Sequence, residues 1–348
     1  MWVRSLRITG LRNLDLTIDH VPDDIIAVVG SNGHGKTSLL ESVSVVLAGR
    51  SFRTHDRSAL VRVGHDEAVV VADVERELAP PVRVGRRVDR EGRLETRVDG
   101  QREQRGPSLP VVSFHPDDVQ IASGGPEQRR RFLDECVVGL DRGAAIRLRQ
   151  AERVLRQRTE ALRAPVLDEV TLSILEERLA RASVEVAELR ARAAEVIAPH
   201  ARAVIDEMLM SAGRVVVTYR GAGDEATLLE QLRARRGDDR RRGVTSVGFH
   251  RDDVEILLDG EPIRRMGSQG QVRTVVVALK VALARAMEAV TKEPPVLVLD
   301  DLLAELDAER ARRAVAMMEG MQAFISHTAP VEGSGFELRI SHGALVDA

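Results

Sequence analysis

The stretch GSNGHGKTSLLES, residues 30–42, decides the fold of this chain. The residues before it (24–29, DIIAVV) form a short apolar run that predicts a buried strand, and the residues after it have the apolar spacing of a helix. Gly30, Gly35, Lys36 and Thr37 match the pattern G-x-x-x-x-G-K-[ST], which requires this order of strand, loop and helix. We therefore predict a phosphate-binding loop, in which backbone N–H groups and the N-terminus of the helix face the phosphates.

This loop supplies the first predicted site residues. Lys36 is expected to reach the β- and γ-phosphates of a nucleotide, and the Thr37 hydroxyl is expected to bind Mg²⁺. The predicted cofactors are therefore ATP and Mg²⁺. The residues expected at the nucleotide are Gly30, Ser31, Asn32, Gly33, His34, Gly35, Lys36, Thr37 and Ser38.

Two carboxylates end an apolar run in the second half of the chain, PPVLVLDD at residues 294–301. In a phosphate-loop ATPase this arrangement places Asp300 at the metal ion and Asp301 beside the γ-phosphate as a catalytic residue. The alternative is a buried strand that merely ends in an Asp-Asp turn. Asp301 stands where many cassette ATPases have glutamate, and a carboxylate retracted by roughly 1.5 Å predicts slow hydrolysis.

Three further segments resemble motifs of ATP-binding-cassette ATPases. AELD (304–307) and AFISHT (323–328) stand where these ATPases have the D-loop and the switch histidine, so Asp307 is expected at the nucleotide and His327 in a catalytic role. GSQGQ (267–271) resembles the signature sequence, whose residues here, expected at a γ-phosphate, are Ser268, Gly270 and Gln271. Because a signature loop is too far from its own phosphate loop to contact that nucleotide, we predict an ATP-dependent homodimer with ATP between two heads.

The chain between the phosphate loop and the signature segment is far longer than a transporter subunit needs, so we expect an insertion. Residues 144–163 and 168–198 are two long helical patterns, which predict a short antiparallel helical arm; the alternative is two ordinary helices on one core. The apolar residues of the second pattern alternate spacings of three and four: Leu172, Leu175, Leu179, Ala182, Val186, Leu189, Ala193 and Val196. An arginine-rich loop is expected at residues 235–243.

We therefore predict an α/β fold, namely an ABC-type P-loop ATPase head with an antiparallel β subdomain and an inserted α-helical, coiled-coil-like lobe. The alternating segments of residues 68–100 provide the antiparallel part. The head, lobe I, is expected to comprise residues 1–125 and 211–348, and the helical lobe II residues 126–210.

Composition narrows the class of protein. A net charge near −3 argues against a globally basic coat for nucleic acid, although a local basic stripe is still allowed. The single cysteine, Cys136, excludes an internal disulfide, and no apolar run reaches the roughly 18 residues that would span a bilayer. We expect a cytoplasmic protein with no membrane role.

Longer stretches resemble the RecF family of DNA replication and repair ATPases. The most specific are GRSFRT (49–54), GGPEQRRRFLD (124–134) and HRDD (250–253), and the resemblance runs over most of the chain. It implies an ATP-driven dimer that clamps DNA, as duplex or as a single-strand/double-strand junction, at single-strand gaps, with RecO and RecR as mediator partners. The rivals are a related cassette ATPase in a defence or regulatory complex and a transporter-type ATPase subunit, which the long insertion disfavours.

Several other residues are candidates with an open alternative. Arg12 and Asn13 are expected either at the nucleotide or facing solvent, and Gln120 is the candidate Q-loop ligand of the metal, with His115 as its rival. The arginines considered for DNA phosphates, or else for a solvated face, are Arg50, Arg53, Arg57, Arg129, Arg130 and Arg131.

Overall fold

A computed structural model describes residues 1–104, 108–141, 143–209, 215–221, 223–301 and 306–346. By their contacts they form two compact units. Unit 1 comprises Met1–Asp118, Val204–Ala212 and Gln269–Ala348, and unit 2 comprises Val119–Ala203 and Gly213–Ser268. No helix in the described ranges is long and apolar enough to cross a membrane.

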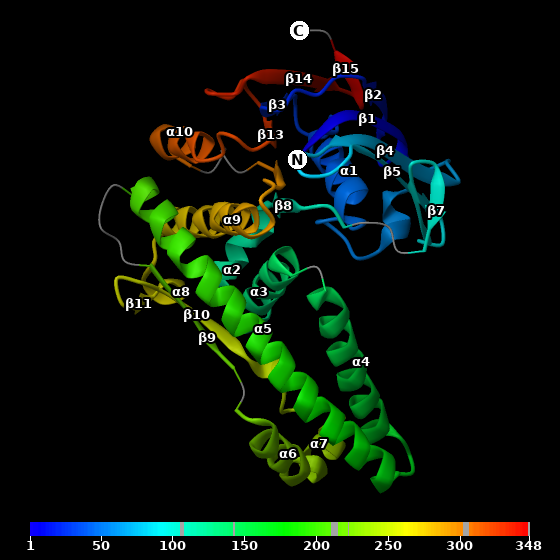
Figure 1. The fold of residues 1–348 in the computed structure, drawn as a ribbon, viewed down its shortest axis with the longest axis vertical. Coiled ribbons are helices and arrows are strands. Elements are labelled where there is room, and N and C mark those ends of the chain that lie inside the picture. The colour runs from blue at the N-terminus through cyan, green and yellow to red at the C-terminus, as the bar shows by residue number, and fades with distance from the viewer. Residues whose placement is uncertain (105–107, 142, 210–214, 222, 302–305, 347–348) are drawn as a thin grey trace. The chain divides into compact units, whose positions relative to one another are not determined.

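A mainly parallel sheet forms the centre of unit 1 (Figure 1). Its strand order is β15-β14-β3-β13-β12-β8, and only β14 and β15 pair in antiparallel fashion. The strands are β3 (Ile25–Val29), β8 (Val111–Phe114), β12 (Val296–Leu299), β13 (Ala323–His327), β14 (Phe336–Ser341) and β15 (Ala344–Val346). Every residue of β3 and β12 is buried, as expected for parallel strands that are covered on both faces.

Helices cover the two faces of this sheet. Val296 and Val298 of β12 share an apolar cluster with α1 (Lys36–Ala48), whereas Leu297 and Leu299 lie against α9 (Gln269–Thr291). The short helices of unit 1 are η1 (Arg57–Leu60), η2 (Pro116–Val119, whose last residue belongs to unit 2) and α10 (Ala308–Ala316). Because the side chains of a strand alternate between faces, one buried strand holds both helices.

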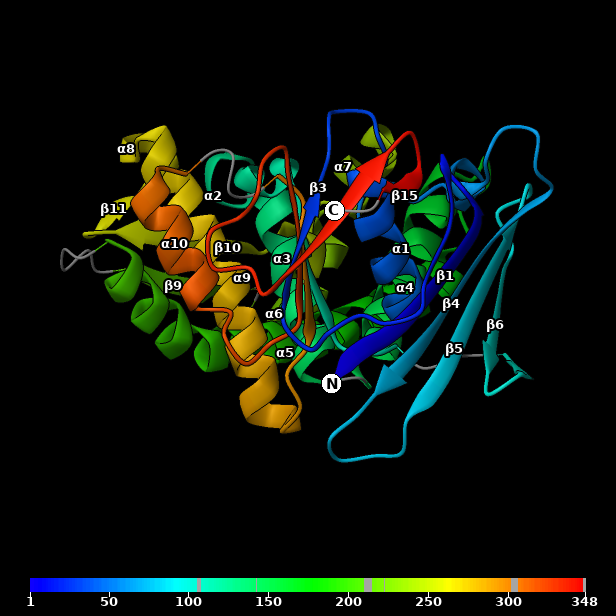
Figure 2. The ribbon, with the colours of Figure 1, turned by 90° about the horizontal axis from the view of Figure 1, so that it is seen from above.

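An antiparallel sheet covers α1 from the other side (Figure 2). Its order is β2-β1-β4-β5-β6-β7. Alternate residues of β4 are buried, among them Val70 and Val74, so that one face of the sheet joins the core. The strands are β1 (Trp2–Leu11), β2 (Leu14–Ile18), β4 (Glu67–Glu75), β5 (Val82–Asp89), β6 (Leu94–Val98) and β7 (Gln101–Glu103). The meander expected at residues 68–100 is confirmed.

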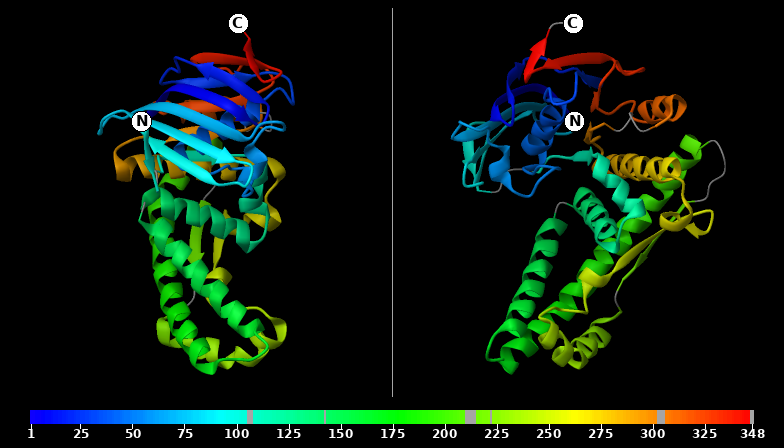
Figure 3. Two further views of the ribbon diagram at one scale, coloured as in Figure 1. Left: turned by 90° about the vertical axis from the view of Figure 1, so that its right-hand side faces the viewer. Right: turned by 180° about the vertical axis from the view of Figure 1, so that it is seen from behind.

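Unit 2 contains helices and a small antiparallel sheet of order β11-β10-β9 (Figure 3). Its helices are α2 (Gln120–Ser123), α3 (Pro126–Leu140), α4 (Ala144–Arg163), α5 (Glu169–Leu209, which ends in unit 1), α6 (Glu225–Ala234), α7 (Arg236–Arg242), η3 (Phe249–Arg251) and α8 (Ile263–Met266). Its strands are β9 (Val215–Arg220), β10 (Asp253–Leu258) and β11 (Glu261–Pro262). Residues 213–268, which were expected in lobe I, group with the helices because β10 pairs with β9 and packs on α3.

Helices α4 and α5 run antiparallel, as expected. Arg147 of α4 lies 3.8 Å from Glu185 of α5, and Arg158, further along α4, lies 3.1 Å from the earlier residue Glu176. The heptad residues Leu172, Leu179 and Val186 are buried. The pair is nevertheless covered by α7, through Arg158 and Asp239, so that it forms part of a wider core.

Two local expectations are wrong. The helix expected to end at residue 198 continues through Pro199, since buried residues on both sides, including Ile197 and Ala201, hold it in place. The expected loop at 235–243 is helix α7, with Asp238 in its first turn, arginines in its last turn and Gly243 as a left-handed C-cap. Charges of this order complement the helix dipole.

Arg158 is the centre of a buried ionic cluster in unit 2. Its side chain is 0% exposed, and its guanidinium donates to Asp239 Oδ2 at 2.8 Å and to Glu176 Oε1 at 3.1 Å. Glu176 has a second partner in Arg236, at 2.6 Å, whereas Arg158 is the only arginine that an ion pair joins to Asp239 in the described part of the chain. Loss of Arg158 would therefore leave the Asp239 charge buried and uncompensated.

We predict that Arg158→Met lowers the free energy of unfolding by roughly 3 kcal/mol, because a buried pair that loses one partner retains the desolvation cost of the other. Chemical denaturation followed by circular dichroism measures this loss. Arg156→Met, at an exposed position of the same helix, is the control and should change stability by less than about 0.5 kcal/mol. Equal losses in the two variants would contradict the assignment.

Candidate functional site: a phosphate-loop cavity

The expected loop between β3 and α1 is present, and its geometry requires glycine at two positions. Gly35 precedes α1 with φ 111°, and a Cβ there would lie 2.7 Å from Leu14 Cδ2. A Cβ on Gly30 would lie 2.3 Å from the carbonyl oxygen of Ile340 on β14. The loop can therefore close tightly only because these side chains are absent.

Lys36 lies at the centre of the loop. Its side chain is 5% exposed, and Nζ donates to the carbonyl oxygens of Gly30 (2.8 Å) and Ser31 (3.2 Å) and to Asn32 Oδ1 (3.3 Å). The ammonium group and the N-terminus of α1 thus offer positive charge at one place. An anion with several oxygens, such as a polyphosphate, suits this arrangement.

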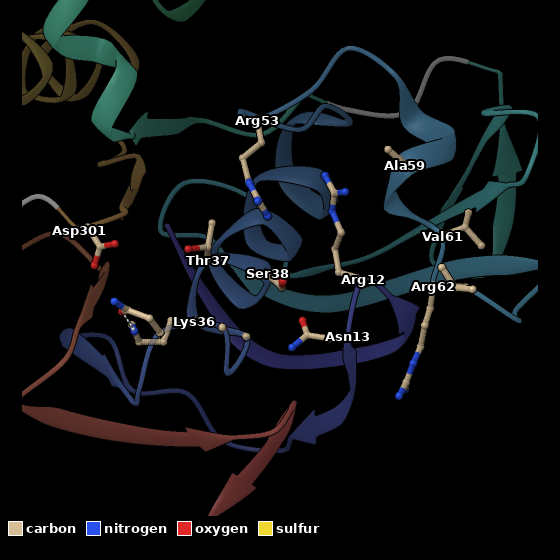
Figure 4. Close-up of a pocket in the computed structure, with 14 residues that line it drawn as sticks. Arg12, Asn13, Lys36, Thr37, Ser38, Arg53, Ala59, Val61, Arg62 and Asp301 are labelled. Atoms are coloured by element: carbon tan, nitrogen blue, oxygen red, sulfur yellow. Dashed lines mark hydrogen bonds between the residues drawn. The ribbon is translucent and has the colours of Figure 1, made fainter.

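A cavity of about 610 Å³ opens over the loop (Figure 4). Lys36 and Thr37 lie at one end, and the other end is formed by the segment that follows η1. The lining residues are Arg12, Asn13, Asn32, Gly33, Gly35, Lys36, Thr37, Ser38, Arg53, Ala59, Val61, Arg62, Val63 and Asp301. Three arginines and one lysine therefore face a single cavity.

Asp300 is tied to two hydroxyl groups at the end of β12. It is 6% exposed, and its Oδ1 accepts from Thr37 Oγ1 and from Ser326 Oγ, both at 2.8 Å. Burial raises the pKa of Asp300 above 3.8, although these hydrogen bonds and the charge of Arg53 act in the opposite direction. The carboxylate and the Thr37 hydroxyl are hard oxygen donors of the kind that Mg²⁺ prefers.

A metal here would need further ligands. Among the described residues, no group of three or more His, Cys, Asp or Glu side chains could hold an ion. Mg²⁺ usually keeps several waters and is bound through one or two carboxylates together with substrate phosphates. The residues present fit that mode of binding.

Of the two catalytic candidates, the structure places only Asp301 at the cavity. Its backbone has φ 51°, and its N–H donates to Ser326 Oγ at 2.8 Å. His327 ends β13, where its Nδ1 lies 2.9 Å from the carbonyl oxygen of Ala329 and 3.1 Å from the Ala329 nitrogen, and it is absent from the lining. The left-handed backbone of Asp301 is uncommon for a residue other than glycine. Where such conformations occur, they cluster at functional sites.

The signature and D-loop residues that the structure describes are absent from the cavity lining. Gly270 and Gln271 form the first turn of α9 and are not in the cavity lining. Ser268, the last residue of unit 2, is exposed. Asp307 caps α10 by accepting from the Arg310 N–H at 2.9 Å, while residues 304 and 305 of the D-loop segment lie outside the described residues.

The candidates for the Q-loop differ in position. Gln120 is an exposed residue that opens α2 in unit 2. His115 is held within unit 1, since its Nε2 lies 3.4 Å from Asp118 Oδ1 and its ring stacks on Phe52 at 5.9 Å. His115 does not line the cavity.

Arg12 and Asn13, whose alternative was solvent, both line the cavity. So does Arg53, which was considered for DNA, so that it belongs with the phosphate loop. Three residues near the cavity were not expected from the sequence: Arg62, Ser326 and Glu41. Glu41 is 0% exposed and accepts hydrogen bonds from Arg12. The sequence offers one sign of the role of Glu41: it is the single acidic residue of α1, among apolar and small residues.

The other arginines considered for DNA differ in burial and in their partners. Arg129 is 4% exposed and forms a bidentate pair with Asp253 at 2.9 and 3.1 Å, which removes it from the candidates. Arg130 donates to the carbonyl oxygen of Asp252 and Arg131 to Glu127, each at 2.7 Å. Arg50 and Arg57 are exposed.

Comparisons with known proteins identify relatives of this chain. The family model for the RecF/RecN/SMC N terminal domain matches residues 2–329. The DNA replication and repair protein RecF of Symbiobacterium thermophilum is 34% identical over 344 residues, covering 94% of this chain and 92% of that protein. RecF of Gloeobacter violaceus is 34% identical over 347 residues, with the same coverage of 94% and 92%.

Solved structures extend the likeness to the fold. A structure of the recombination mediator protein RecF with ATP, from the RecFOR pathway, matches with a TM-score of 0.90 and 27% identity, covering 99% of this chain and 97% of that one. An Smc head bound to the C-winged helix domain of ScpA matches with a TM-score of 0.60 at 15% identity, which shows a shared fold only. The predicted ABC-type head with a helical insertion is thereby confirmed.

The buried Asp300 gives a stability prediction. Asp300→Asn should stabilise the nucleotide-free protein by about 1 kcal/mol at neutral pH, because the amide oxygen can still accept from Thr37 and Ser326 while a desolvated charge is removed. Since the folded pKa is raised, the charged carboxylate costs stability as pH rises from 3.8 through the folded value. The gain should therefore disappear below pH 3.8 and be complete above the folded pKa.

Thermal unfolding measured across this pH range tests the prediction. Asp307→Asn, which keeps the helix cap at an exposed position, is the control and should show no such gain. A loss of stability in Asp300→Asn at neutral pH, or a gain that is independent of pH, would show that burial does not govern this carboxylate.

Proposed function

The chain belongs to the RecF family, and from this we propose that it is an ATP-dependent DNA-binding protein of replication-linked recombinational repair. Its likeness to RecF proteins covers 94% of the chain, which weighs against a divergent cassette ATPase in a defence or regulatory complex. The observation that carries the proposal is the phosphate-loop cavity, whose lining includes Lys36 and Asp301.

ATP is the proposed ligand of the cavity. The loop and Lys36 suit the β- and γ-phosphates, and Thr37 with Asp300 would hold Mg²⁺ against their oxygens. A solved RecF structure that contains ATP supports this choice. The metal would supply neutralisation of the charge that develops on the transferred phosphoryl group.

Asp301 is the proposed catalytic residue for ATP hydrolysis. Asp301 lines the same cavity as Thr37, and from there its carboxylate could orient and polarise a water molecule. Aspartate is shorter than glutamate by one methylene, so we expect slow turnover that acts as a timer for release. His327 remains a second candidate that would have to turn away from Ala329.

An ATP-dependent homodimer is part of the proposal, and the signature residues support it. Gly270 and Gln271, which do not line their own chain's cavity, are proposed with Ser268 and Asp307 to contact the nucleotide bound by a second copy. ATP would then join two heads, and the pair would close on DNA. By family, the DNA is a gap or junction, the mediator partners are RecO and RecR, and the compartment is the cytoplasm.

The phosphate loop provides the test. Lys36→Ala should weaken ATP binding by roughly 100-fold, because the phosphates lose a charged donor, and it should abolish ATP-dependent dimerisation. Calorimetry measures affinity and analytical ultracentrifugation measures the dimer. Lys292→Ala removes an exposed lysine elsewhere and should change neither. A Lys36→Ala protein that still dimerises on ATP would overturn the proposal that nucleotide joins the heads.

A further inference from the structure

Glu41 is a buried acidic residue on α1, the helix that begins with Lys36. Its side chain is 0% exposed, and both carboxylate oxygens accept hydrogen bonds. Carboxylates are almost never fully buried unless they are paired, so its partners explain its presence. These partners are Arg12, Ser51 and Arg53.

The first partner is held in a bidentate geometry. Arg12 Nε lies 3.0 Å from Glu41 Oε2, and Arg12 Nη2 lies 3.0 Å from Oε1. The backbone of Arg12 is left-handed, with φ 54°, and its N–H donates to the carbonyl oxygen of Leu60 at 2.8 Å. Both the backbone and the guanidinium group of Arg12 are thus fixed. Two parallel N–H···O bonds define the position of a guanidinium group more strictly than a single bond does.

The second set of partners belongs to the segment after α1. Ser51 Oγ donates to Glu41 Oε1 at 2.5 Å and accepts from the N–H groups of Arg53 (2.9 Å) and Thr54 (3.1 Å). Arg53 Nη1 lies 3.5 Å from Glu41 Oε2. The turn at residues 51–54, part of the stretch GRSFRT, is therefore closed by backbone bonds to Ser51 Oγ and anchored to Glu41 through the side chains of Ser51 and Arg53.

Two cations consequently share one carboxylate oxygen. Arg12 and Arg53 both contact Oε2. Figure 4 shows their side chains extending in opposite directions, so that the two guanidinium groups lie at the same level. Without the negative charge between them, the partly buried guanidinium group of Arg12 and the more exposed one of Arg53 would repel each other. The cluster of Arg12, Arg53 and Glu41 retains one net positive charge at the cavity, which favours an anionic ligand.

We propose that Glu41 is a positioning residue of the nucleotide site, which holds Arg12 and Arg53 at the cavity so that both guanidinium groups act on the bound polyphosphate. The inference rests on the proposed function, in which this cavity binds ATP. It assigns the GRSFRT turn to the nucleotide site rather than to DNA. Glu41 itself, with no exposed surface, acts through the two arginines.

Glu41→Gln tests the inference, because glutamine keeps the size of the side chain and one acceptor but loses the charge. We expect the dissociation constant for ATP, measured by calorimetry, to rise on the order of tenfold. The loss should be non-additive with Arg12→Ala and with Arg53→Ala in double-mutant cycles, since those residues transmit it. Glu41→Asp, which restores the charge at a shorter reach, should recover part of the affinity.

The matched control is Glu293, a second buried carboxylate of unit 1. It is 3% exposed, accepts from Arg76 at 3.3 Å and from the Leu78 N–H at 3.1 Å, and does not line the cavity. Glu293→Gln should lower the melting temperature and leave the affinity for ATP unchanged. This comparison separates the positioning of a ligand from the general cost of a broken buried pair.

Ser51→Ala covers the case in which Glu41→Gln does not fold, because it leaves the Arg12 pair intact and removes the anchor of the turn. It should weaken ATP binding in a manner non-additive with Arg53→Ala. Wild-type affinity in folded Glu41→Gln or Ser51→Ala protein, or strict additivity with both arginine variants, would overturn the inference alone. Wild-type protein that fails to bind ATP would overturn the proposed function and the inference with it.

Discussion

The structure depends on one carboxylate oxygen, Asp300 Oδ1, which accepts hydrogen bonds from Thr37 and Ser326. These three residues come from α1, from the end of β12 and from β13, and they meet because the carboxyl ends of parallel strands lie at one edge of a sheet. These two hydrogen bonds orient the Asp300 carboxylate. The Ser326 hydroxyl also accepts a hydrogen bond from the backbone N–H of Asp301. This arrangement buries the Asp300 carboxylate, and burial raises its pKa. A desolvated carboxylate of this kind is typical of sites retained for binding rather than for stability.

Unit 2 uses charge differently, since its buried ion pairs join segments of the chain. Arg129 pairs with Asp253, and Arg190 pairs with Asp134 at 2.8 Å and with Asp252 at 3.1 Å. The stretches GGPEQRRRFLD and HRDD, which carried the resemblance to RecF, therefore contact each other directly or through α5. The loss of one partner of a buried ion pair strongly destabilises the folded protein. The need to keep these ion pairs intact explains why GGPEQRRRFLD and HRDD are more specific to the family than the phosphate loop. No contact with DNA is needed for that explanation.

Features that depend on neighbouring residues could be predicted from the sequence. The β3–loop–α1 order, the meander and the antiparallel pairing of α4 with α5 follow from periodicity, glycine and spacing, and Asp300 and Asp301 were placed by the strand before them. Features that depend on distant contacts could not. Pro199 reads locally as a helix end, yet tertiary burial keeps α5 continuous. Arg53 reads as one more surface arginine, and only the fold brings it to Glu41 and the cavity.

The central claim is that ATP in the phosphate-loop cavity drives two copies of this chain to close on DNA. Analytical ultracentrifugation of the protein with labelled gapped duplex, with and without ATP and at several salt concentrations, tests it most directly. The account predicts a complex of two chains per DNA only with ATP, with an affinity that falls as salt rises, at a slope near −0.9 per phosphate neutralised. ATP-bound protein with no salt-dependent affinity for gapped or blunt DNA would contradict it.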